Sequence, residues 1–515
     1  MSGARDDGPA ASRPGRRPPE RGADRGPAGG PDRPRGPRGP RARSGQRPSE
    51  RTRTGDPARF TAYTVLRSVD EGGYANLELP RLLRGTGLGG RDAAFATELT
   101  YGALRWRGLY DAIVVDASGR GTDEIDAPVL DTLRLGAHQL LGMRVPSHAA
   151  VGETVGLARE VNGAGAAGFV NAVLRRISER TREEWLARVA PPGDGPDALA
   201  VAHSHPEWVV RGLRSALLGH GVCGPDDVAA ELGALLRADN DPPEVTLVAR
   251  PGLVSVAELV DLGARPAPGS PVGAVLPAGD PGSLAPVRDG RAAVQDEGSQ
   301  LLALALAAVP VAGDGYDEEW LDLCAGPGGK AGLLAALAVD RAFLTANEIS
   351  PHRADLVDQA LRAARRAGAR VEVRVGDGRH VGEDEPGRYD RVLVDAPCTG
   401  LGALRRRPDA RWRRTPGDLA DLAVLQRQLL ASALEATRPG GVVGYATCSP
   451  HVNETVYAVA DVLNGRDDVE VLDARAAVQE VAPGIELAGE GPHVQLWPHR
   501  NGTDAMFLAL LRRRG

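Results

Sequence analysis

The stretch that decides the fold is Asp322-Leu323-Cys324-Ala325-Gly326-Pro327-Gly328-Gly329-Lys330. It follows the short apolar segment 320–323 and continues into 331–338, where alanine and leucine favour a helix. A glycine turn between a strand and a helix lets the backbone approach a ligand, and the helix N-terminus offers unpaired N–H groups. Lys330 is the only lysine of the chain, so generic surface charge does not explain it. The sequence therefore predicts a ligand-binding loop made of Cys324, Ala325, Gly326, Pro327, Gly328, Gly329 and Lys330.

The glycine loop departs from the two common nucleotide-binding patterns. A nucleoside-triphosphate loop needs glycine six residues before its lysine and serine or threonine just after it, but Cys324 and Ala331 occupy those positions. A dinucleotide loop needs a third glycine spaced into the helix, and this stretch lacks it. What remains is the loop of an S-adenosylmethionine-dependent methyltransferase, whose cofactor carries no phosphate.

Around this loop, the chain alternates between strand and helix signals from about residue 285 onward. Ser350 and Pro351 predict a helix start, as N-cap and first helical residue. Buried strands separated by helices are typical of a doubly wound, parallel α/β sheet of the Rossmann type. The predicted strands cover residues 320–323, 342–347, 371–375, 391–394, 441–446 and 505–511.

Acidic residues and cysteines follow successive predicted strands. In such a sheet the ligand lies beyond the carboxyl ends of the strands. Glu348 comes nineteen residues after Gly329, the spacing at which an acidic side chain meets ribose hydroxyls. Asp377 is flanked by glycines and could accept a hydrogen bond from an adenine amino group. Asp395 and Cys398 follow the fourth strand, and Cys448 follows the fifth.

The two strand-end cysteines suggest a particular chemistry. Carbon 5 of a pyrimidine is a poor nucleophile, but a thiolate that adds to carbon 6 turns carbon 5 into an enolate-like nucleophile. That carbon can then take a methyl group, a base removes its proton, and the thiolate leaves. The target base must also be unstacked to reach the enzyme. Cys398 and Cys448 are therefore the candidate catalytic residues.

Composition limits the remaining possibilities. Residues 1–56 contain fourteen arginines and seven acidic residues, so a net charge of −6 leaves −13 for the rest of the chain. A basic tail on an acidic body suggests contact with a polyanion, and a solvated leader would explain the composition equally well. No apolar run is long enough for a membrane span, and no secretory signal is evident. Because the four cysteines form no CxxC pair, we expect no metal, no disulfide framework and a cytoplasmic protein with reduced thiols.

A length of 515 residues suits about three domains. Residues 1–56 have almost no large apolar side chains, so we predict a disordered tail. Residues 57–184 show apolar spacing typical of helices throughout and predict an all-α bundle. Residues 185–284 give mixed signals and predict a small α/β connecting domain. Residues 285–515 form the predicted α/β domain.

The motifs resemble those of the Sun/Fmu-type RNA cytosine-C5 methyltransferases of the RsmB-like branch, and the helical segment is similar to that branch's NusB-like RNA-binding domain. The resemblance covers about residues 58 to 515. It is carried by Cys324–Lys330, Asp395-Ala-Pro-Cys398 and Thr447-Cys448-Ser-Pro450, supported by Val145-Pro-Ser-His148, Asn171-Ala-Val-Leu-Arg175, Val294-Gln-Asp296 and Ser299-Gln300.

This resemblance implies a role for each candidate residue. Cys448 is the expected nucleophile, and Cys398 is expected to assist proton removal or product release. Residues 324–330, Glu348, Asp377 and Asp395 are expected to hold S-adenosylmethionine, with Asp395 also near the target base. The expected substrate is small-subunit (16S) rRNA, and we expect a monomer.

The chain departs from the family pattern at three places and carries one conspicuous basic cluster. Gly326 replaces a common alanine, Ala331 a common threonine and Glu348 a common aspartate. The cluster comprises Arg405-Arg-Arg407 and Arg411-Trp412-Arg413-Arg414. Its arginines could bind phosphates and Trp412 could stack on a base, although a solvated loop fits the composition as well.

Two other functions stay open on the sequence alone. The same chemistry could act on tRNA, which assays on separated RNA pools would reveal. Alternatively, the chain could be a non-catalytic RNA-binding ribosome-assembly factor, in which case it would not bind S-adenosylmethionine.

Overall fold

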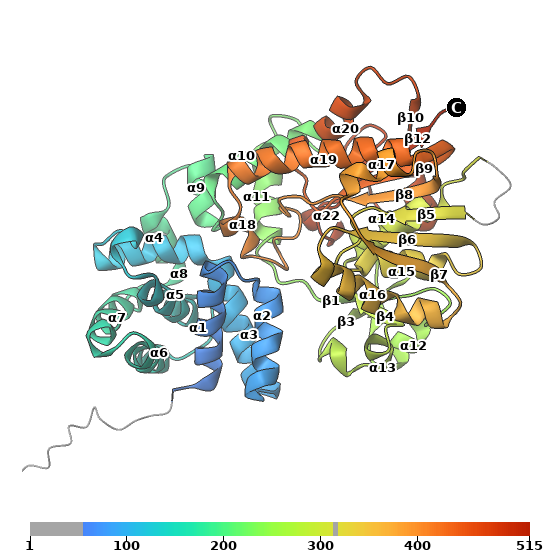
Figure 1. Cartoon of the computed structure of the whole chain (residues 1–515). Helices are drawn as coiled ribbons and strands as arrows, with labels where there is room; N and C mark the ends of the chain where they lie inside the picture. Colours follow the sequence, from blue (N-terminus) through green and yellow to red (C-terminus); the bar gives the residue numbers. More distant parts are fainter. Residues whose placement is uncertain (1–54, 313–317) are drawn as a thin grey trace, which may run out of the picture. The chain divides into compact units, whose positions relative to one another are not determined.

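The computed structural model describes residues 55–312 and 318–515. The predicted tail, residues 1–56, lies outside the described residues except for its last two. The described chain has a helical region, a small antiparallel sheet and a large mixed sheet of Rossmann type (Figure 1). This multidomain layout agrees with the predicted fold class. Within the described residues, no helix is both long and apolar enough to cross a membrane.

The helical region begins where the sequence supplies a cap. The Asp56 carboxylate accepts a hydrogen bond of 2.9 Å from the Ala58 N–H, and Pro57 occupies the first helical position. The helices are α1 (Pro57–Asp70), α2 (Ala75–Thr86), α3 (Gly90–Arg105), α4 (Arg107–Ser118), η2 (Thr122–Glu124), α5 (Ala127–Leu141), α6 (Ser147–Val161), α7 (Ala164–Ile177), α8 (Arg182–Val189), α9 (Pro196–Ala202), α10 (Glu207–Gly219) and α11 (Val228–Ala238).

Helices continue past residue 184, where mixed structure was expected. Residues 185–238 form the end of α8 and α9–α11, so the helices of the predicted α/β segment precede its strands. Proline and glycine between these helices obscured their periodicity. Val209, Leu213 and Leu217 of α10 are buried at helical spacing and pack in one cluster with Leu404 and Trp497. The helical region therefore shares a core with the C-terminal part of the chain.

The small sheet follows α11 and has strand order β2-β3-β1-β4, all antiparallel. β1 and α12 supply strand and helix within the segment whose sequence signals were mixed. β4 lies beyond residue 284 and pairs with β1, so this sheet includes the start of the next predicted segment. Its elements are β1 (Val245–Ala249), α12 (Val256–Asp261), β2 (Arg265–Pro266), β3 (Gly273–Leu276), η3 (Pro281–Ser283), α13 (Ala285–Arg288) and β4 (Ala292–Val294).

The large sheet has strand order β10-β12-β9-β8-β5-β6-β7, with β11 pairing β12. Its elements are α14 (Glu297–Ala308), β5 (Glu318–Asp322), α15 (Gly329–Leu337), β6 (Ala342–Glu348), α16 (Pro351–Arg366), β7 (Arg370–Val375), η4 (Gly378–His380), α17 (Val381–Asp384), β8 (Tyr389–Asp395), α18 (Ala410–Arg413), α19 (Pro416–Ala436), β9 (Thr437–Thr447), η5 (Val452–Glu454), α20 (Val456–Leu463), β10 (Val469–Leu472), α21 (Ala474–Val481), β11 (Val494–Gln495), α22 (Pro498–Asn501) and β12 (Phe507–Arg513).

The prediction of a parallel sheet is right for part of it. β7, β6, β5, β8 and β9 are parallel, but β12 runs antiparallel to both β9 and β10. An apolar run reads the same in either direction, so the sequence of β12 did not reveal its orientation. The five parallel strands bring their carboxyl ends to one edge, and β5 and β8 are neighbours there.

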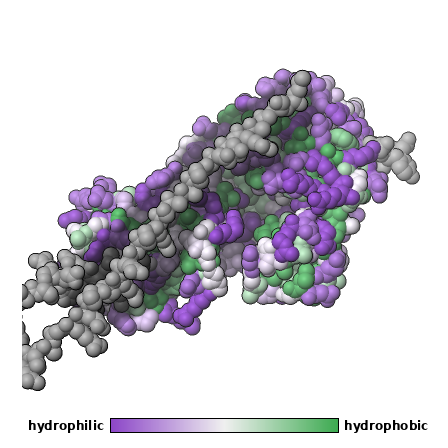
Figure 2. Space-filling model, turned by 60° about the horizontal axis from the view of Figure 1, so that its bottom comes forward, coloured by the Kyte–Doolittle hydropathy of each residue, from purple (hydrophilic) through white to green (hydrophobic). Residues whose placement is uncertain are grey.

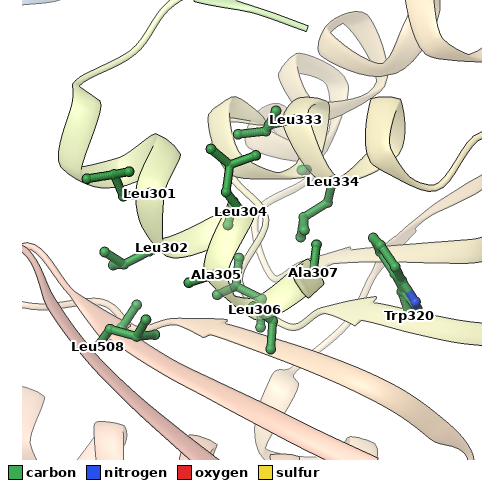
Figure 3. Close-up of a cluster of buried hydrophobic side chains, with 14 of the residues drawn as sticks. Leu301, Leu302, Leu304, Ala305, Leu306, Ala307, Trp320, Leu333, Leu334 and Leu508 are labelled. Carbon is green, nitrogen blue, oxygen red and sulfur yellow. The ribbon is translucent and has the colours of Figure 1, made fainter. Parts of the chain in front are cut away.

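Helices cover both faces of this sheet. On one face, α14, α15, α16 and α21 pack on Trp320, Leu344 and Leu393, and Figure 3 shows the leucines of α14 between α15 and Leu508 of β12. On the other face, α17, α19 and α20 pack on side chains such as Leu321 and Val392. Alternate strand residues thus enter opposite cores, which fixes the register of the strand ends.

The surface shows no single dominant apolar area in the view of Figure 2, where hydrophilic residues interrupt the hydrophobic ones. Large exposed apolar side chains lie on elements far apart in the sequence, for example Leu77, Val294 and Ile349. Isolated apolar side chains are ordinary on protein surfaces. The scattered apolar side chains therefore mark no functional surface, and the strand ends are the stronger candidate.

Candidate active site

The glycine loop joins β5 to α15 and needs glycine at two positions. Gly328 has φ 106°, in the left-handed region, and a Cβ there would lie 2.7 Å from the Ala360 Cβ. A Cβ at Gly326 would lie 2.3 Å from Oε2 of Glu348. The loop backbone thus passes directly over the end of β6, at the place where the sequence predicted a ligand.

Glu348 is buried at the end of β6 and organises this loop. Its Oε2 accepts a hydrogen bond of 3.0 Å from the Gly326 N–H, and its Oε1 accepts one of 3.0 Å from the Ser350 N–H. Arg353 lies 3.4 Å from Oε2 and donates to the Gly326 carbonyl. Ser350 occupies the N-cap of α16 as predicted, but its side chain makes no capping hydrogen bond. Two departures from the family pattern, at 326 and 348, are therefore in direct contact.

Asp322, at the end of β5, is a residue that the sequence reasoning missed. Its carboxylate is fully buried, and neither oxygen has a hydrogen-bond partner among the described residues. Burial, together with the negative charge of Asp395, raises the pKa of Asp322 to about 8. An acidic residue immediately before the glycine loop was the available signal. A buried carboxyl without a partner fits a site whose ligand supplies the missing donor or cation.

Lys330 and Asp395 join the loop to the neighbouring strand. The Lys330 Nζ donates a hydrogen bond of 2.8 Å to Oδ2 of Asp395, at the end of β8. Burial opposes the charge of Lys330, but Asp395 outweighs it and raises the pKa of the lysine above its usual value. The only lysine of the chain is thus a buried partner of a predicted site residue.

Asp377, after β7, faces a different environment. Its carboxylate accepts from Arg379, with Nη2 at 2.6 Å from Oδ2 and Nε at 3.0 Å from both oxygens. This contact lowers the pKa of Asp377 to about 2. The Gly376 N–H donates to the Glu348 carbonyl at 3.2 Å, so the ends of β6 and β7 adjoin. Asp377 therefore lies on the same edge as Glu348, with its carboxylate engaged by an exposed arginine.

The two candidate catalytic cysteines lie together. The sulfur atoms of Cys398 and Cys448 are 3.3 Å apart, at the ends of the neighbouring strands β8 and β9. This contact lowers the pKa of Cys448, and Arg407 and Lys330 lower it further. The same contact, with burial, raises the pKa of Cys398 above its usual range. One sulfur is thus favoured as a thiolate and the other as its hydrogen-bond donor.

The other two cysteines do not join this pair. Cys324 lies in the glycine loop, where burial and neighbouring carboxylates raise its pKa well above the usual value, so it is a poor nucleophile. Cys223 follows α10 and packs with that helix and α11. Within the described residues, no group of three histidine, cysteine or acidic side chains is arranged to hold a metal ion.

The arginine cluster is not an RNA-facing patch, and that hypothesis is wrong for its central members. Arg411 is fully buried and donates to the Ser204 carbonyl at 3.0 Å and to the Asn240 side chain at 2.9 Å. The Trp412 indole N–H donates to the Leu104 carbonyl at 3.2 Å. These side chains satisfy backbone carbonyls of the helical region, which composition could not reveal. Arg407 is the member of the cluster that is exposed.

Comparisons with known proteins agree with this geometry. The family described as 16S rRNA methyltransferase RsmB/F matches residues 313–512, and the NusB family matches residues 56–179. A Mycobacterium tuberculosis (strain H37Rv) protein named as a methyltransferase is 54% identical over 472 residues, 90% of this chain and 98% of the relative. A Bacillus subtilis (strain 168) protein named "Probable ribosomal RNA small subunit methyltransferase B" is 30% identical over 459 residues, 86% of this chain and 95% of the relative.

The fold agrees as well. A solved structure titled "Crystal Structure of PH0851" matches with a TM-score of 0.73 at 19% identity, covering 90% of this chain and 99% of that chain. The resemblance inferred from the motifs, including the NusB-like region, is confirmed. The roles of individual site residues stay predictions. The chain belongs to the RsmB/F family of 16S rRNA methyltransferases.

Proposed function

We propose that this protein methylates carbon 5 of a cytosine in 16S rRNA, using S-adenosylmethionine and a covalent bond between Cys448 and carbon 6 of the base. The observation that carries the proposal is the pair of sulfur atoms, 3.3 Å apart at two adjacent strand ends. Methylation of an amine or a carboxylate would need no such pair. The relative named as a ribosomal RNA small subunit methyltransferase supports rRNA as the substrate.

The cofactor site fits a cationic, phosphate-free ligand. Asp322 offers a buried carboxyl without a partner, and Gly326 and Gly328 leave space that a Cβ would fill. We assign the loop 324–330, Glu348, Asp377 and Asp395 to cofactor binding, with Glu348 toward the ribose. When bound, S-adenosylmethionine supplies an electrophilic methyl group. The lysine of the glycine loop is already paired with Asp395, so it is not free to bind a phosphate.

The residues of the thiol pair then perform the chemistry. The Cys448 thiolate attacks carbon 6 of an unstacked cytosine and forms a C–S bond, while the electron pair of the carbon 5–carbon 6 double bond moves to carbon 5. After carbon 5 has gained its methyl group, its proton is lost to water, and Cys398, which keeps its own proton, assists product release by hydrogen bonding to the departing Cys448 sulfur. The electrons of that C–H bond restore the double bond, and the C–S bond breaks to return the Cys448 thiolate. Lys330 and Asp395, beside the pair, hold the base and loop in place.

The test uses purified full-length protein, 16S rRNA transcribed without modifications, and S-adenosylmethionine labelled in its methyl group. We expect label in rRNA, and bisulfite sequencing should locate it at a cytosine. Cys448→Ala should abolish transfer, whereas Cys398→Ala should accumulate a protein–RNA adduct that migrates slowly on a denaturing gel. Full transfer by Cys448→Ala would refute the mechanism.

The same experiment separates the alternatives. Label in a tRNA pool, with none in rRNA, would move the activity to tRNA. Absence of S-adenosylmethionine binding in calorimetry, with retained rRNA binding, would favour a non-catalytic assembly factor.

A further inference from the structure

A carboxylate beneath the thiol pair has no role in the mechanism above. Glu454 ends η5, six residues after Cys448, and is fully buried. Its Oε1 accepts from the Thr399 N–H at 2.8 Å and from the Gln426 side-chain amide at 3.1 Å. Its Oε2 accepts from the Thr399 hydroxyl at 2.5 Å. One carboxylate therefore gathers three donors from two separate segments of the chain.

These donors lead directly to both cysteines. Thr399 follows Cys398 in the chain, and its hydroxyl lies 3.2 Å from the hydroxyl of Ser449, which follows Cys448. Gln426 also donates to the carbonyl of the residue before Cys398, Pro397, at 2.8 Å. The loop of each thiol is thus held, through one or two hydrogen bonds, by the same carboxylate.

A purely structural role would look different. A carboxylate that only caps a turn needs one N–H from its own turn, whereas the donors to Glu454 come from α19 and from the loop after β8. Within the described residues, the hydrogen-bond partners of the Glu454 carboxylate are Thr399 and Gln426, and both are uncharged. A buried carboxylate without a cation costs free energy unless its hydrogen bonds are complete. Three neutral donors therefore compensate for the burial of this carboxylate beside the two thiols.

The negative charge of Glu454 acts more strongly on Cys398 than on Cys448. The negative charge of Glu454 is among the causes that raise the pKa of Cys398, after the contact with Cys448 and burial. It is not among the leading influences on Cys448. A proton shared by the two sulfurs is thereby favoured on Cys398, which leaves Cys448 as the thiolate.

We propose that Glu454 is a positioning residue that aligns the Cys398 and Cys448 loops and keeps their shared proton on Cys398. This inference rests on the proposed function, because that function gives the two sulfurs their unequal roles. Thr399 carries the effect to both loops, and Gln426 completes the hydrogen bonds of the carboxylate.

The first test needs neither RNA nor cofactor. Full-length protein is alkylated with iodoacetamide across pH 6 to 9, and mass spectrometry follows each cysteine-containing peptide. In the parent protein, Cys448 should react about tenfold faster than Cys398 near pH 7, since only the thiolate is a nucleophile. Glu454→Gln keeps the shape of the side chain but removes its charge, and should reduce this preference about threefold or more. An unchanged preference and pH profile would overturn the inference.

The second test follows catalysis. Glu454→Gln should lower kcat about tenfold or more while leaving KM for rRNA and the Kd for S-adenosylmethionine within about twofold. Glu480→Gln, on the exposed face of α21, is the matched control and should behave as the parent. Equal losses in cofactor binding and kcat would mark Glu454 as merely structural and overturn the inference.

A second variant guards against a folding defect in Glu454→Gln. Thr399→Val removes the hydroxyl that links Glu454 to Ser449 and should also reduce the alkylation preference, whereas Thr399→Ser should restore it. If alkylation behaves as expected but no rRNA is methylated, the proposed function fails and the alignment of the thiols stands. If rRNA is methylated but neither variant alters the alkylation preference, the proposed function stands and the role inferred for Glu454 fails.

Discussion

The carboxyl edge of the large sheet has two halves that are built differently. At the cofactor half, formed by the ends of β5, β6 and β7, Arg353 and Arg379 are 46% and 43% exposed and hold Glu348 and Asp377 from the solvent side. At the thiol half, formed by the ends of β8 and β9, Thr399, Ser449 and Glu454 are all fully buried or nearly so. The proposed cofactor half is therefore held partly by exposed side chains that are able to move. The half that must align two sulfur atoms is fixed by buried hydrogen bonds.

The largest effect should come from the thiol half. Cys448→Ala removes the proposed nucleophile, so methyl transfer to 16S rRNA should fall by a factor of about 1,000 or more. The Kd for S-adenosylmethionine, measured by calorimetry, should stay within about twofold because the cofactor half is untouched. A large loss of cofactor affinity would show that the two halves do not act separately.

The second-largest effect should come from the Lys330–Asp395 pair, which links the two halves. Lys330→Met leaves Asp395 without its partner, and breaking a largely buried pair typically costs about 3 kcal/mol of folding free energy. Methyl transfer should fall about a hundredfold as the loop and β8 lose alignment. Chemical denaturation and the labelling assay measure the two effects.

A matched double variant sharpens this result. Lys330→Met with Asp395→Asn removes both charges, so it should regain most of the stability without regaining activity. Recovery of activity would show that the pair serves folding alone.

A smaller effect should follow from Gly326→Ala in the cofactor half. The added Cβ would lie 2.3 Å from Oε2 of Glu348, so the loop must shift and cofactor affinity should fall about tenfold. Glu348→Asp in the same chain withdraws the carboxylate and should restore most of the affinity. Calorimetry measures both, and cysteine alkylation should remain unchanged. If the second substitution fails to compensate, the two departures from the family pattern are independent.

The smallest effect should be a difference between the two halves in local stability as pH falls. Burial lowers the pKa of His220, which hydrogen-bonds the Pro450 carbonyl beside the thiols, to about 4. A group whose pKa is lowered by folding stabilises the fold above its unfolded value near 6.5, and that contribution is lost as pH falls toward 4. Asp377, with a pKa of about 2, keeps its charge over this range. Between pH 6.5 and 4, amide exchange should rise around 448–454 before it rises around 376–379.

The residues that lie at the carboxyl edge of the large sheet were largely predictable from local sequence patterns and from the topology of a parallel sheet. The glycine loop, Glu348 and Asp377 follow apolar runs, and parallel strands bring their ends together whatever the side chains are. The proximity of Cys398 and Cys448 follows from the same rule, although their separation does not.

What escaped prediction depends on contacts between distant segments. The burial of Arg411 requires carbonyls at Ser204 and Asp239, about 170 to 210 residues away in the chain. Glu454 carries no local signal in the sequence, because its partners Thr399 and Gln426 come from other segments of the chain. The direction of β12 has no local signal at all, since pairing partners decide it.

The segment between Cys398 and α19 also settles how this enzyme can be divided. It starts at Cys398, a candidate catalytic residue, and ends at Arg411 and Trp412, which donate hydrogen bonds to carbonyls of the helical region. Excising residues 285–515 would strip those donors of their acceptors and expose Leu401 and Leu404 to water. Residues 285–515 are therefore not a detachable module, and the helical region is part of the scaffold of the candidate active site.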